Sequence, residues 1–414
     1  MAQRVVDVLV PVALDQAYSY RVPAGVELAP GDLVTVPLGA RMATGVTWAE
    51  NRQPNPRLDN RMRDIEAKLD IPPLKPELRK FIDWVSAYTL SPRGSVLRMA
   101  LRMGEHLGPA RERVGVRLAG PAPKRITPAR ERVLALLADG LAHGKRELAE
   151  EAAVSPGVVD GLVDEGTLES LVLPPDPVAR APDPDFCRPD FTAAQREAAD
   201  ALCATVAAGG YGVTLLDGVT GAGKTQVYFD AVGEIIRRGK QALVLVPEIA
   251  LTSQFLDRFA QRFGVRPAEW HSQLSQRLRA RTWSAVATGD VSVIVGARSA
   301  LFLPYADLGL IVVDEEHDPA YKQEDGARYH ARDMAVVRAR GADIPIVLVS
   351  ATPSVETEVN ARRGRYARVY LAERFGSRQL PAIEAIDLRT EGPPRGRFIA
   401  PRLAQAVSTA LERG

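Results

Sequence analysis

The stretch LLDGVTGAGKTQVYF, residues 215–229, places a glycine-rich turn between an apolar run and a helical pattern. Its fixed positions satisfy G-x-x-x-x-G-K-[ST]. Glycines let backbone N–H groups point at a phosphate, and the helix that follows directs its positive end to the same place. The lysine of this pattern reaches the β- and γ-phosphates, and the threonine hydroxyl holds Mg²⁺. We therefore predict a nucleoside triphosphate site lined by Gly218, Val219, Thr220, Gly221, Ala222, Gly223, Lys224 and Thr225.

Five apolar runs rich in β-branched residues alternate with helical patterns in the second half of the chain. They cover residues 212–217, 242–247, 291–296, 308–314 and 344–350. Near-continuous apolar runs are typical of parallel strands that are buried on both faces of a sheet. The sequence therefore predicts a doubly wound α/β domain that carries the phosphate-binding turn.

The run LGLIVVDEEHD supplies acidic residues at the end of one predicted strand. Asp314 stands at the strand end, where a carboxylate is expected to grip Mg²⁺, and Glu315 beside it can polarise the attacking water. An acidic pair after a strand is otherwise only a solvated strand end, but the phosphate-binding turn upstream favours the catalytic interpretation. His317 either couples the γ-phosphate to nearby loops or caps the turn.

The rest of the chain divides into segments of different character. Residues 1–105 contain strand-like runs and turn signals, whereas residues 106–173 contain three short helices and a β-wing, which predict a winged helix. A winged helix either contacts duplex DNA or mediates protein contacts. Residues 174–190 are rich in proline and predict a stiff linker before the α/β domain of residues 191–380. We therefore expect a multidomain α/β protein, because 414 residues exceed one ordinary core.

Composition excludes several other classes of protein. No apolar run approaches the length of a membrane span, and the apolar start is interrupted by acid and proline, which predicts a strand rather than a signal peptide. Cys187 and Cys203 form neither a disulfide framework nor a zinc site, which fits a reducing cytoplasm. Ten basic residues between Arg93 and Arg132 accompany only three acidic ones. This local excess either neutralises DNA phosphates or belongs to a solvated connector.

Eight motifs follow one another along the chain: FTAAQ, GVTGAGKT, LVPEIALTSQ, HSQLS, GARSALF, VDEEHD, YKQEDGARYHARD and SATPS. Together they resemble the first motor lobe of superfamily-two helicases, and more narrowly the replication-restart helicases, also called primosomal protein N-prime. The N-terminal motifs YSYRVP and VPLGAR also match that family. The resemblance implies a RecA-like motor lobe that uses ATP and Mg²⁺ after a β-rich DNA-binding domain and a winged helix. It also implies 3′–5′ movement on stalled or abandoned forks, loading of the replicative helicase, and contacts with primosome proteins and single-stranded DNA-binding protein.

The resemblance assigns roles to residues of the motor lobe. Gln195 would read the adenine edge, and Ser350, Ala351 and Thr352 would link hydrolysis to movement. Residues 321–332 resemble a loop that senses single-stranded DNA.

Within this loop, Tyr321, Arg328 and Tyr329 offer faces for base stacking, while Lys322 and Arg332 can meet phosphates. The alternative is that both tyrosines are core residues. An aromatic residue common in the family is replaced by Ala327, which predicts a weaker stacking platform.

In the family, the N-terminal unit captures the 3′ end of a nascent strand. Tyr18 occupies the aromatic position expected to stack on the terminal base, and Gly39 lies in the matching turn. Ser19 replaces the usual acidic partner, so a hydroxyl instead of a carboxylate would meet the 3′-OH. The alternative for Tyr18 is a packed core residue.

Residues 381–414 resemble the first strand and helix of a second motor lobe. The printed sequence contains no Q-x-x-G-R-x-x-R-type segment and none of the Cys-x-x-Cys pairs through which the family binds zinc. We therefore expect either a fragment or a chain that has lost its motor half, with ATP and DNA binding, feeble hydrolysis and no unwinding. Two other hypotheses are a fork-recognition scaffold with a vestigial nucleotide site and a different translocase, and the N-terminal unit speaks against the second.

Overall fold

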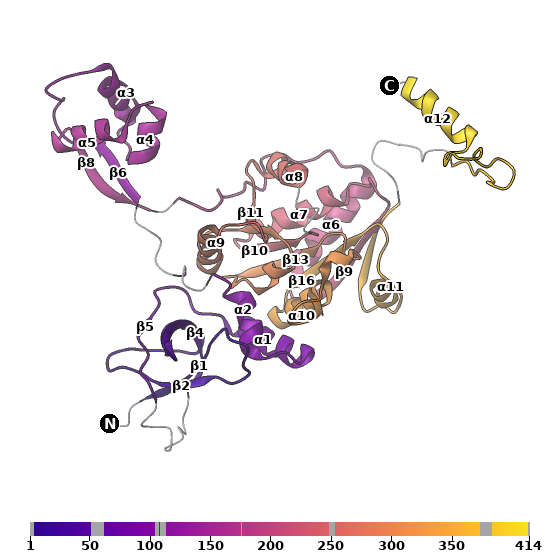
Figure 1. Ribbon diagram of the computed structural model, residues 1–414, viewed down its shortest axis with the longest axis horizontal. Coiled ribbons are helices and arrows are strands. Elements are labelled where there is room, and N and C mark those ends of the chain that lie inside the picture. The colour runs from indigo at the N-terminus through magenta and orange to yellow at the C-terminus, as the bar shows by residue number, and fades with distance from the viewer. Residues whose placement is uncertain are drawn as a thin grey trace. The chain divides into compact units, whose positions relative to one another are not determined.

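The computed structural model describes residues 4–50, 62–103, 107, 113–174, 176–247, 253–372 and 383–412. The chain forms two compact units, Met1–Glu373 and Arg374–Gly414 (Figure 1). Among the described helices, none combines the length and the apolar character needed to cross a membrane. Of the motif VPEIALT, residues 248–252 lie outside the described part of the chain.

The N-terminal segment is an antiparallel sheet followed by two helices, as the β-rich pattern predicts. The sheet has the strand order β2-β1-β4-β3-β5. Its strands are β1 (Val5–Leu9), β2 (Tyr18–Arg21), β3 (Leu33–Leu38), β4 (Arg41–Glu50) and β5 (Ala67–Lys68). Helices α1 (Pro76–Thr89) and α2 (Arg93–Ala100) come next, and α1 buries Leu78, Phe81, Ile82 and Val85 at helical spacing.

A second group of elements has a small core of its own. It consists of β6 (Arg113–Leu118), α3 (Pro128–Leu136), the 3₁₀ helix η3 (Leu137–Asp139), β7 (His143–Gly144), α4 (Lys145–Glu151), α5 (Pro156–Asp164) and β8 (Leu168–Leu173). The three strands form an antiparallel sheet in the order β7-β6-β8. The Thr127 side chain caps α3, as the sequence predicts. Three helices and a short sheet are present, and the assignment to the winged-helix class remains a prediction.

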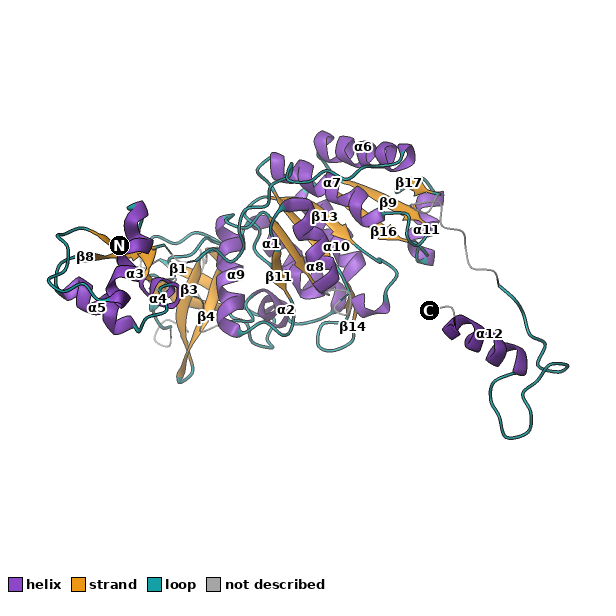
Figure 2. Cartoon of the chain, turned by 90° about the horizontal axis from the view of Figure 1, so that it is seen from above, coloured by secondary structure: helices purple, strands orange, loops and turns teal. Residues whose placement is uncertain are grey.

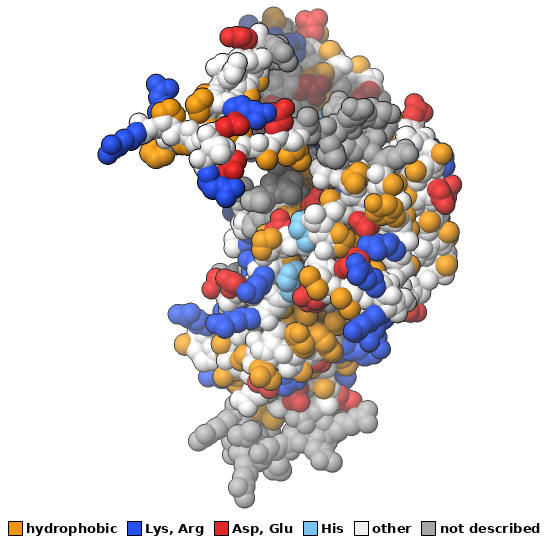
Figure 3. All heavy atoms as spheres, turned by 90° about the vertical axis from the view of Figure 1, so that its right-hand side faces the viewer, with side chains coloured by type: hydrophobic (Ala, Val, Ile, Leu, Met, Phe, Trp, Pro, Cys, Tyr) orange, Lys and Arg blue, Asp and Glu red, His pale blue; other side chains and the backbone are white. Residues whose placement is uncertain are grey.

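Most described members of the Arg93–Arg132 basic group have partners within the protein. Arg113 pairs with Glu147 at 2.9 Å, Arg130 pairs with Glu165 at 2.7 Å, and Arg132 donates to a main-chain carbonyl. Figure 3 shows another face of the protein, on which acidic side chains are also interspersed among basic ones. The excess of positive charge counted along the sequence is therefore reduced by internal ion pairs.

The proline-rich segment contacts the domain that follows it. The Asp183 N–H donates to the Phe263 carbonyl at 3.0 Å, and Arg237 donates to the Asp185 carboxylate at 2.8 Å. Arg262 donates to the Pro184 carbonyl at 2.8 Å. The second half of this segment is therefore anchored to the α/β domain by hydrogen bonds.

The α/β domain is a seven-stranded parallel sheet with the order β11-β12-β10-β13-β16-β9-β17. Its strands are β9 (Gly212–Gly218), β10 (Gln241–Leu245), β11 (Ala268–Trp270), β12 (Val293–Gly296), β13 (Leu308–Val313), β16 (Pro345–Ser350) and β17 (Ala367–Leu371). The side chains of adjacent strand residues, such as Leu215 and Leu216, enter different apolar clusters, as strands buried on both faces require. The predicted doubly wound sheet is confirmed.

Helices lie on both faces of this sheet (Figure 2). One cluster contains residues of α6 (Ala193–Ala208), α7 (Lys224–Arg237) and α8 (Ser253–Phe263). The other contains residues of α9 (Gln276–Thr288) and α10 (Ala331–Ala342), together with α1 and the 3₁₀ helix η5 (Arg298–Phe302). The hairpin β14 (Lys322–Gln323) and β15 (Tyr329–His330) follows the 3₁₀ helix η6 (Pro319–Tyr321), and α11 (Val355–Arg362) precedes the edge strand β17.

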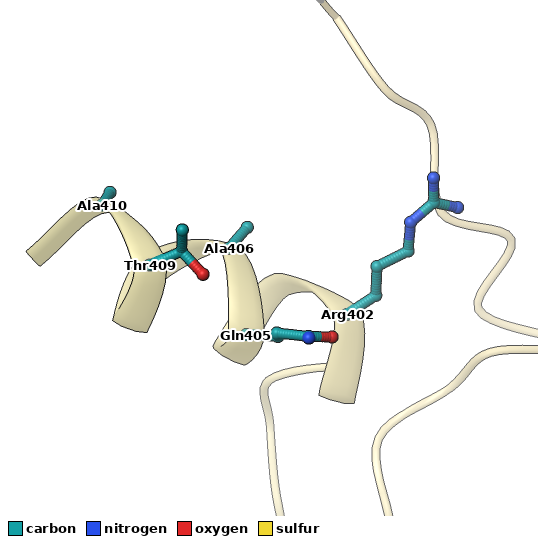
Figure 4. A pocket seen from close by; sticks show the side chains of 5 residues that line it. All are labelled: Arg402, Gln405, Ala406, Thr409 and Ala410. Carbon is teal, nitrogen blue, oxygen red and sulfur yellow. The ribbon is translucent and has the colours of Figure 1, made fainter. Parts of the chain in front are cut away.

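The second unit contains helix α12 (Pro401–Glu412). Of the strand and helix expected after residue 381, only the helix forms among residues 383–412, so the strand prediction is wrong for this segment. The reason is that strand backbone groups need a paired neighbour, and no strand pairing involves these residues. Figure 4 shows a pocket on one side of α12, which is lined by Arg402, Gln405, Ala406, Thr409 and Ala410. None of the predicted site residues lies there.

Candidate nucleotide and DNA sites

The phosphate-binding turn connects the end of β9 to the start of α7. Gly221 and Gly223 both have φ of +82°, a left-handed conformation that glycine adopts without a Cβ penalty. At Gly218, an added Cβ would lie 2.8 Å from the Leu371 Cβ of the edge strand, so this position also requires glycine. Helix α7 begins at Lys224, and its N-terminus therefore opens on the turn.

Lys224 is folded back against this turn. Its Nζ donates to the carbonyls of Gly218 at 2.8 Å and Val219 at 3.3 Å, and the residue is only 8% exposed. Burial lowers the pKa of Lys224, while the nearby charges of Glu315 and Asp314 oppose this effect. The structure thus brings the predicted lysine and the predicted acidic pair into one electrostatic site.

Asp314 lies directly after β13 and is held by two donors. The Glu315 N–H donates to Oδ1 at 3.0 Å, and the Tyr228 hydroxyl donates to Oδ2 at 2.8 Å. Burial raises the pKa of Asp314 to about 6. Glu315 has φ of +46°, which is uncommon for a residue other than glycine and is often found at functional sites.

The chemistry of these groups fits Mg²⁺. The Asp314 carboxylate and the Thr225 hydroxyl are hard oxygen donors, and Mg²⁺ in such sites takes one or two carboxylates plus the phosphates of the nucleotide. In the part of the chain that the structure describes, no group of three or more His, Cys, Asp or Glu side chains is arranged for a metal ion. Cys187 is exposed, and burial raises the pKa of Cys203 to about 11.

Gln195 contacts the phosphate-binding turn from helix α6. Its Nε2 donates to the Ala222 carbonyl at 2.8 Å, and its Oε1 accepts from the Thr192 N–H at 3.0 Å. The side chain is 4% exposed and completes a capping box at the start of α6. Gln195 therefore supports the turn directly, and adenine recognition stays a prediction.

The residues after Asp314 are linked to the end of strand β16. His317 Nδ1 lies 2.8 Å from Ser350 Oγ, which also accepts from the Thr352 N–H at 3.0 Å. Ala351 lies between these two residues. The contact joins the acidic motif to the SAT motif, and its role in coupling hydrolysis to movement stays a prediction.

The predicted stacking residues Tyr321 and Tyr329 are core residues, so their assignment as exposed stacking faces is wrong. Tyr321 is 1% exposed, and its hydroxyl donates to the carbonyls of Leu245 at 3.0 Å and Asp314 at 2.6 Å. Tyr329 is 5% exposed and packs edge-on against Phe302.

The predicted phosphate contact of Arg332 is also wrong, because its guanidinium is buried against Glu316 and Ser354. Lys322 and Arg328 are exposed and remain candidates for DNA contact. Ala327 is buried, so it offers no platform in place of the missing aromatic.

In the N-terminal sheet, Tyr18 is half-buried against an apolar cluster. Ser19, on the opposite face of β2, donates to Asp7 Oδ1 at 2.8 Å, so a carboxylate does stand at this position, although on the neighbouring strand. Arg63 donates to the Gly39 carbonyl at 2.8 Å and places a cation at the predicted turn. The roles of Tyr18, Ser19 and Gly39 in end capture stay predictions.

Three residues with contacts in or beside the motifs of the candidate site were not identified from the sequence. Tyr228 follows Lys224 by four positions, so it lies one turn along the same helix, and this spacing could have revealed it. Glu316 is fully buried and accepts from Ser354, Thr357 and Arg332. Asp217 pairs with Arg368 at 2.9 Å across strands that are distant in sequence, so no local signal could have shown it.

Comparison with known proteins agrees with this arrangement. Residues 7–102 match the family described as a 3′ DNA-binding domain, and residues 192–360 match the DEAD/DEAH box helicases. Replication restart protein PriA of Rickettsia conorii is 31% identical over 409 residues, which are 99% of this chain and 52% of that protein. The predicted resemblance to replication-restart helicases is confirmed.

Two further relatives carry the same name, replication restart protein PriA. The protein of Haemophilus influenzae is 31% identical over 421 residues, covering 99% of this chain and 57% of the relative. That of Bacillus subtilis is 37% identical over 258 residues, covering 61% of this chain and 32% of the relative. The chain therefore spans about half the length of the relatives from Rickettsia conorii and Haemophilus influenzae. Within that span, the region that matches the 3′ DNA-binding domain family precedes the region that matches the DEAD/DEAH box helicases.

Proposed function

We propose that this chain binds ATP with Mg²⁺ and binds DNA forks as part of a replication-restart helicase. Lys224 would neutralise the β- and γ-phosphates, Thr225 and Asp314 would hold Mg²⁺, and Glu315 would polarise the attacking water. Gln195 would select adenine. When bound, Mg²⁺ supplies charge neutralisation at the phosphates.

One observation carries the nucleotide part of this proposal. The Tyr228 hydroxyl of α7, the helix that begins at Lys224, donates to Asp314 Oδ2 at 2.8 Å, although the two motifs are far apart in sequence. The glycine turn, the helix N-terminus and the acidic pair thus meet at one edge of the sheet, where ligands of doubly wound folds bind.

The DNA part of the proposal follows from the N-terminal domain and its relatives. Tyr18, Ser19 and Gly39 would contact the 3′ end of a nascent strand, while Lys322 and Arg328 would contact single-stranded DNA. His317, Ser350, Ala351 and Thr352 would couple hydrolysis to 3′–5′ movement. This movement would expose single-stranded template DNA, on which the replicative helicase is loaded with the help of primosome proteins and single-stranded DNA-binding protein. These steps would take place in the cytoplasm.

The nucleotide site is tested by comparing Lys224→Ala with Lys240→Ala. Lys240 is an exposed lysine of the same domain, so its loss controls for net charge. A hydrogen bond to a charged group contributes about 1.5–3 kcal/mol, so we expect roughly 10- to 100-fold weaker binding of a fluorescent ATP analogue for Lys224→Ala alone. Equal affinity of both variants would contradict the proposed site. Fork binding by a wild-type chain that binds no nucleotide would instead favour a fork-recognition scaffold.

A further inference from the structure

Tyr228 is a fully buried tyrosine of helix α7 whose hydroxyl faces the candidate Mg²⁺ ligands. Its ring packs edge-on against Phe229 with centroids 5.2 Å apart. Its hydroxyl donates to Asp314 Oδ2 at 2.8 Å. This buried hydroxyl therefore ties Asp314 to helix α7, three residues after Thr225, and Asp314 and Thr225 are the two residues that the proposed function assigns to Mg²⁺.

The position of this hydroxyl follows from helix and strand geometry. Thr225 and Tyr228 are three residues apart on α7, so both side chains lie on one face of the helix. That face meets the end of β13, where Asp314 follows the last strand residue. A buried hydroxyl needs a partner, and the carboxylate supplies one in a bond stronger than a neutral pair would make.

A second tyrosine holds the main chain at the same point. The Tyr321 hydroxyl donates to the Asp314 carbonyl at 2.6 Å, so it fixes the backbone and leaves the carboxylate to other donors. Among the described residues, the hydrogen bonds that reach the carboxylate itself come from the Tyr228 hydroxyl and the Glu315 N–H. Tyr228 thus controls a degree of freedom that Tyr321 does not.

We propose that Tyr228 is a positioning residue for Mg²⁺: its hydroxyl sets the orientation of the Asp314 carboxylate relative to Thr225. This inference rests on the proposed nucleotide site. Groups that orient metal ligands typically affect metal affinity strongly, because a ligand that rotates freely must be ordered when the ion binds. The chemistry predicts an effect on the Mg²⁺-dependent part of nucleotide binding and little effect on the rest.

Tyr228→Phe removes only the hydroxyl and keeps the buried ring. Tyr305→Phe is the matched control, because Tyr305 is also buried and its hydroxyl donates to the Ala300 carbonyl at 3.2 Å, outside the site. The affinity for a fluorescent ADP analogue is measured for each protein in excess Mg²⁺ and in EDTA, and Mg²⁺ is titrated at fixed nucleotide. We expect Tyr228→Phe to weaken the Mg²⁺ titration about tenfold, with affinity in EDTA changed less than about twofold.

The outcomes separate this inference from the proposed function. An unchanged Mg²⁺ titration for Tyr228→Phe, or equal losses with and without Mg²⁺, would overturn the positioning role, since a purely structural residue affects both conditions. The same loss in Tyr305→Phe would also overturn it. A wild-type chain that binds no nucleotide at all would overturn the proposed site and, with it, this inference.

Discussion

Replacing Asp314 by Asn tests whether the negative charge of this buried carboxylate lowers the free energy of unfolding. Burial raises the pKa of Asp314 from 3.8 to about 6, so folding favours the protonated carboxyl. Its contribution to stability is complete below pH 3.8, where both the folded and unfolded chains are protonated, and is lost as the pH rises through 6. The full loss corresponds to about 3 kcal/mol, and since Asp314 is partly exposed by area, we expect about 1–2 kcal/mol.

Asn carries no charge, so it lacks this pH-dependent loss. The amide also disturbs the bonds from Tyr228 and Glu315, but this cost is the same at each pH and cancels. About a third of this loss has already occurred at pH 4.5, so we expect the stability difference between Asp314→Asn and wild type to rise by about 1 kcal/mol in favour of the variant between pH 4.5 and pH 8.

The assay is urea unfolding of both proteins at the two pH values, without nucleotide or metal, followed by the fluorescence of buried tryptophan. Other titrating groups contribute equally to both proteins and cancel in the difference. A stability difference that stays constant with pH, or that moves against the variant at high pH, would refute the reasoning.

Four further substitutions test the roles of other residues. Tyr321→Ala should lower the unfolding free energy by about 3–5 kcal/mol, because it empties a core position. Arg328→Ala should leave stability unchanged and weaken single-stranded DNA binding. If Tyr321→Ala instead weakened DNA binding without a loss of stability, Tyr321 would be a stacking residue after all. Glu316→Gln should lower the unfolding free energy by about 3 kcal/mol, because Arg332 loses its fully buried carboxylate partner and keeps the exposed carboxylates of Asp333 and Glu356; an unchanged melting temperature would contradict this. Tyr18→Ala should weaken binding to forks with a 3′-OH and leave forks with a blocked 3′ end unaffected, and equal losses on both would remove its end-specific role.

The geometry of the candidate nucleotide site could be predicted because it is local. The glycines, Lys224 and Thr225 lie on one continuous strand, turn and helix, and the fixed spacing alone determines their arrangement. Asp314 could be placed because parallel strands of a doubly wound sheet end at the same edge. The parallel sheet itself followed from apolar runs that are buried on both faces.

The DNA contacts were predicted less accurately than the nucleotide site, because the exposure of a side chain depends on tertiary packing. Nothing in the spacing of Tyr321 shows that its hydroxyl meets carbonyls at the ends of β10 and β13. The sequence likewise suggests that Arg332 is a surface cation, whereas in the fold its guanidinium is buried beside Glu316. The basic residues from Arg93 to Arg132 show a local excess of positive charge in the sequence partly because carboxylate partners such as Glu147 of α4 and Glu169 of β8 lie outside that stretch.

A crystal structure of this chain with Mg²⁺ and a non-hydrolysable ATP analogue tests the central claim most directly. The account predicts that the β- and γ-phosphates lie against the N–H groups of residues 218–225 and that Lys224 Nζ leaves the carbonyls of Gly218 and Val219 to meet them. It also predicts Mg²⁺ between Thr225 and Asp314. An analogue bound elsewhere, or a turn that stays empty at saturating analogue, would contradict the account.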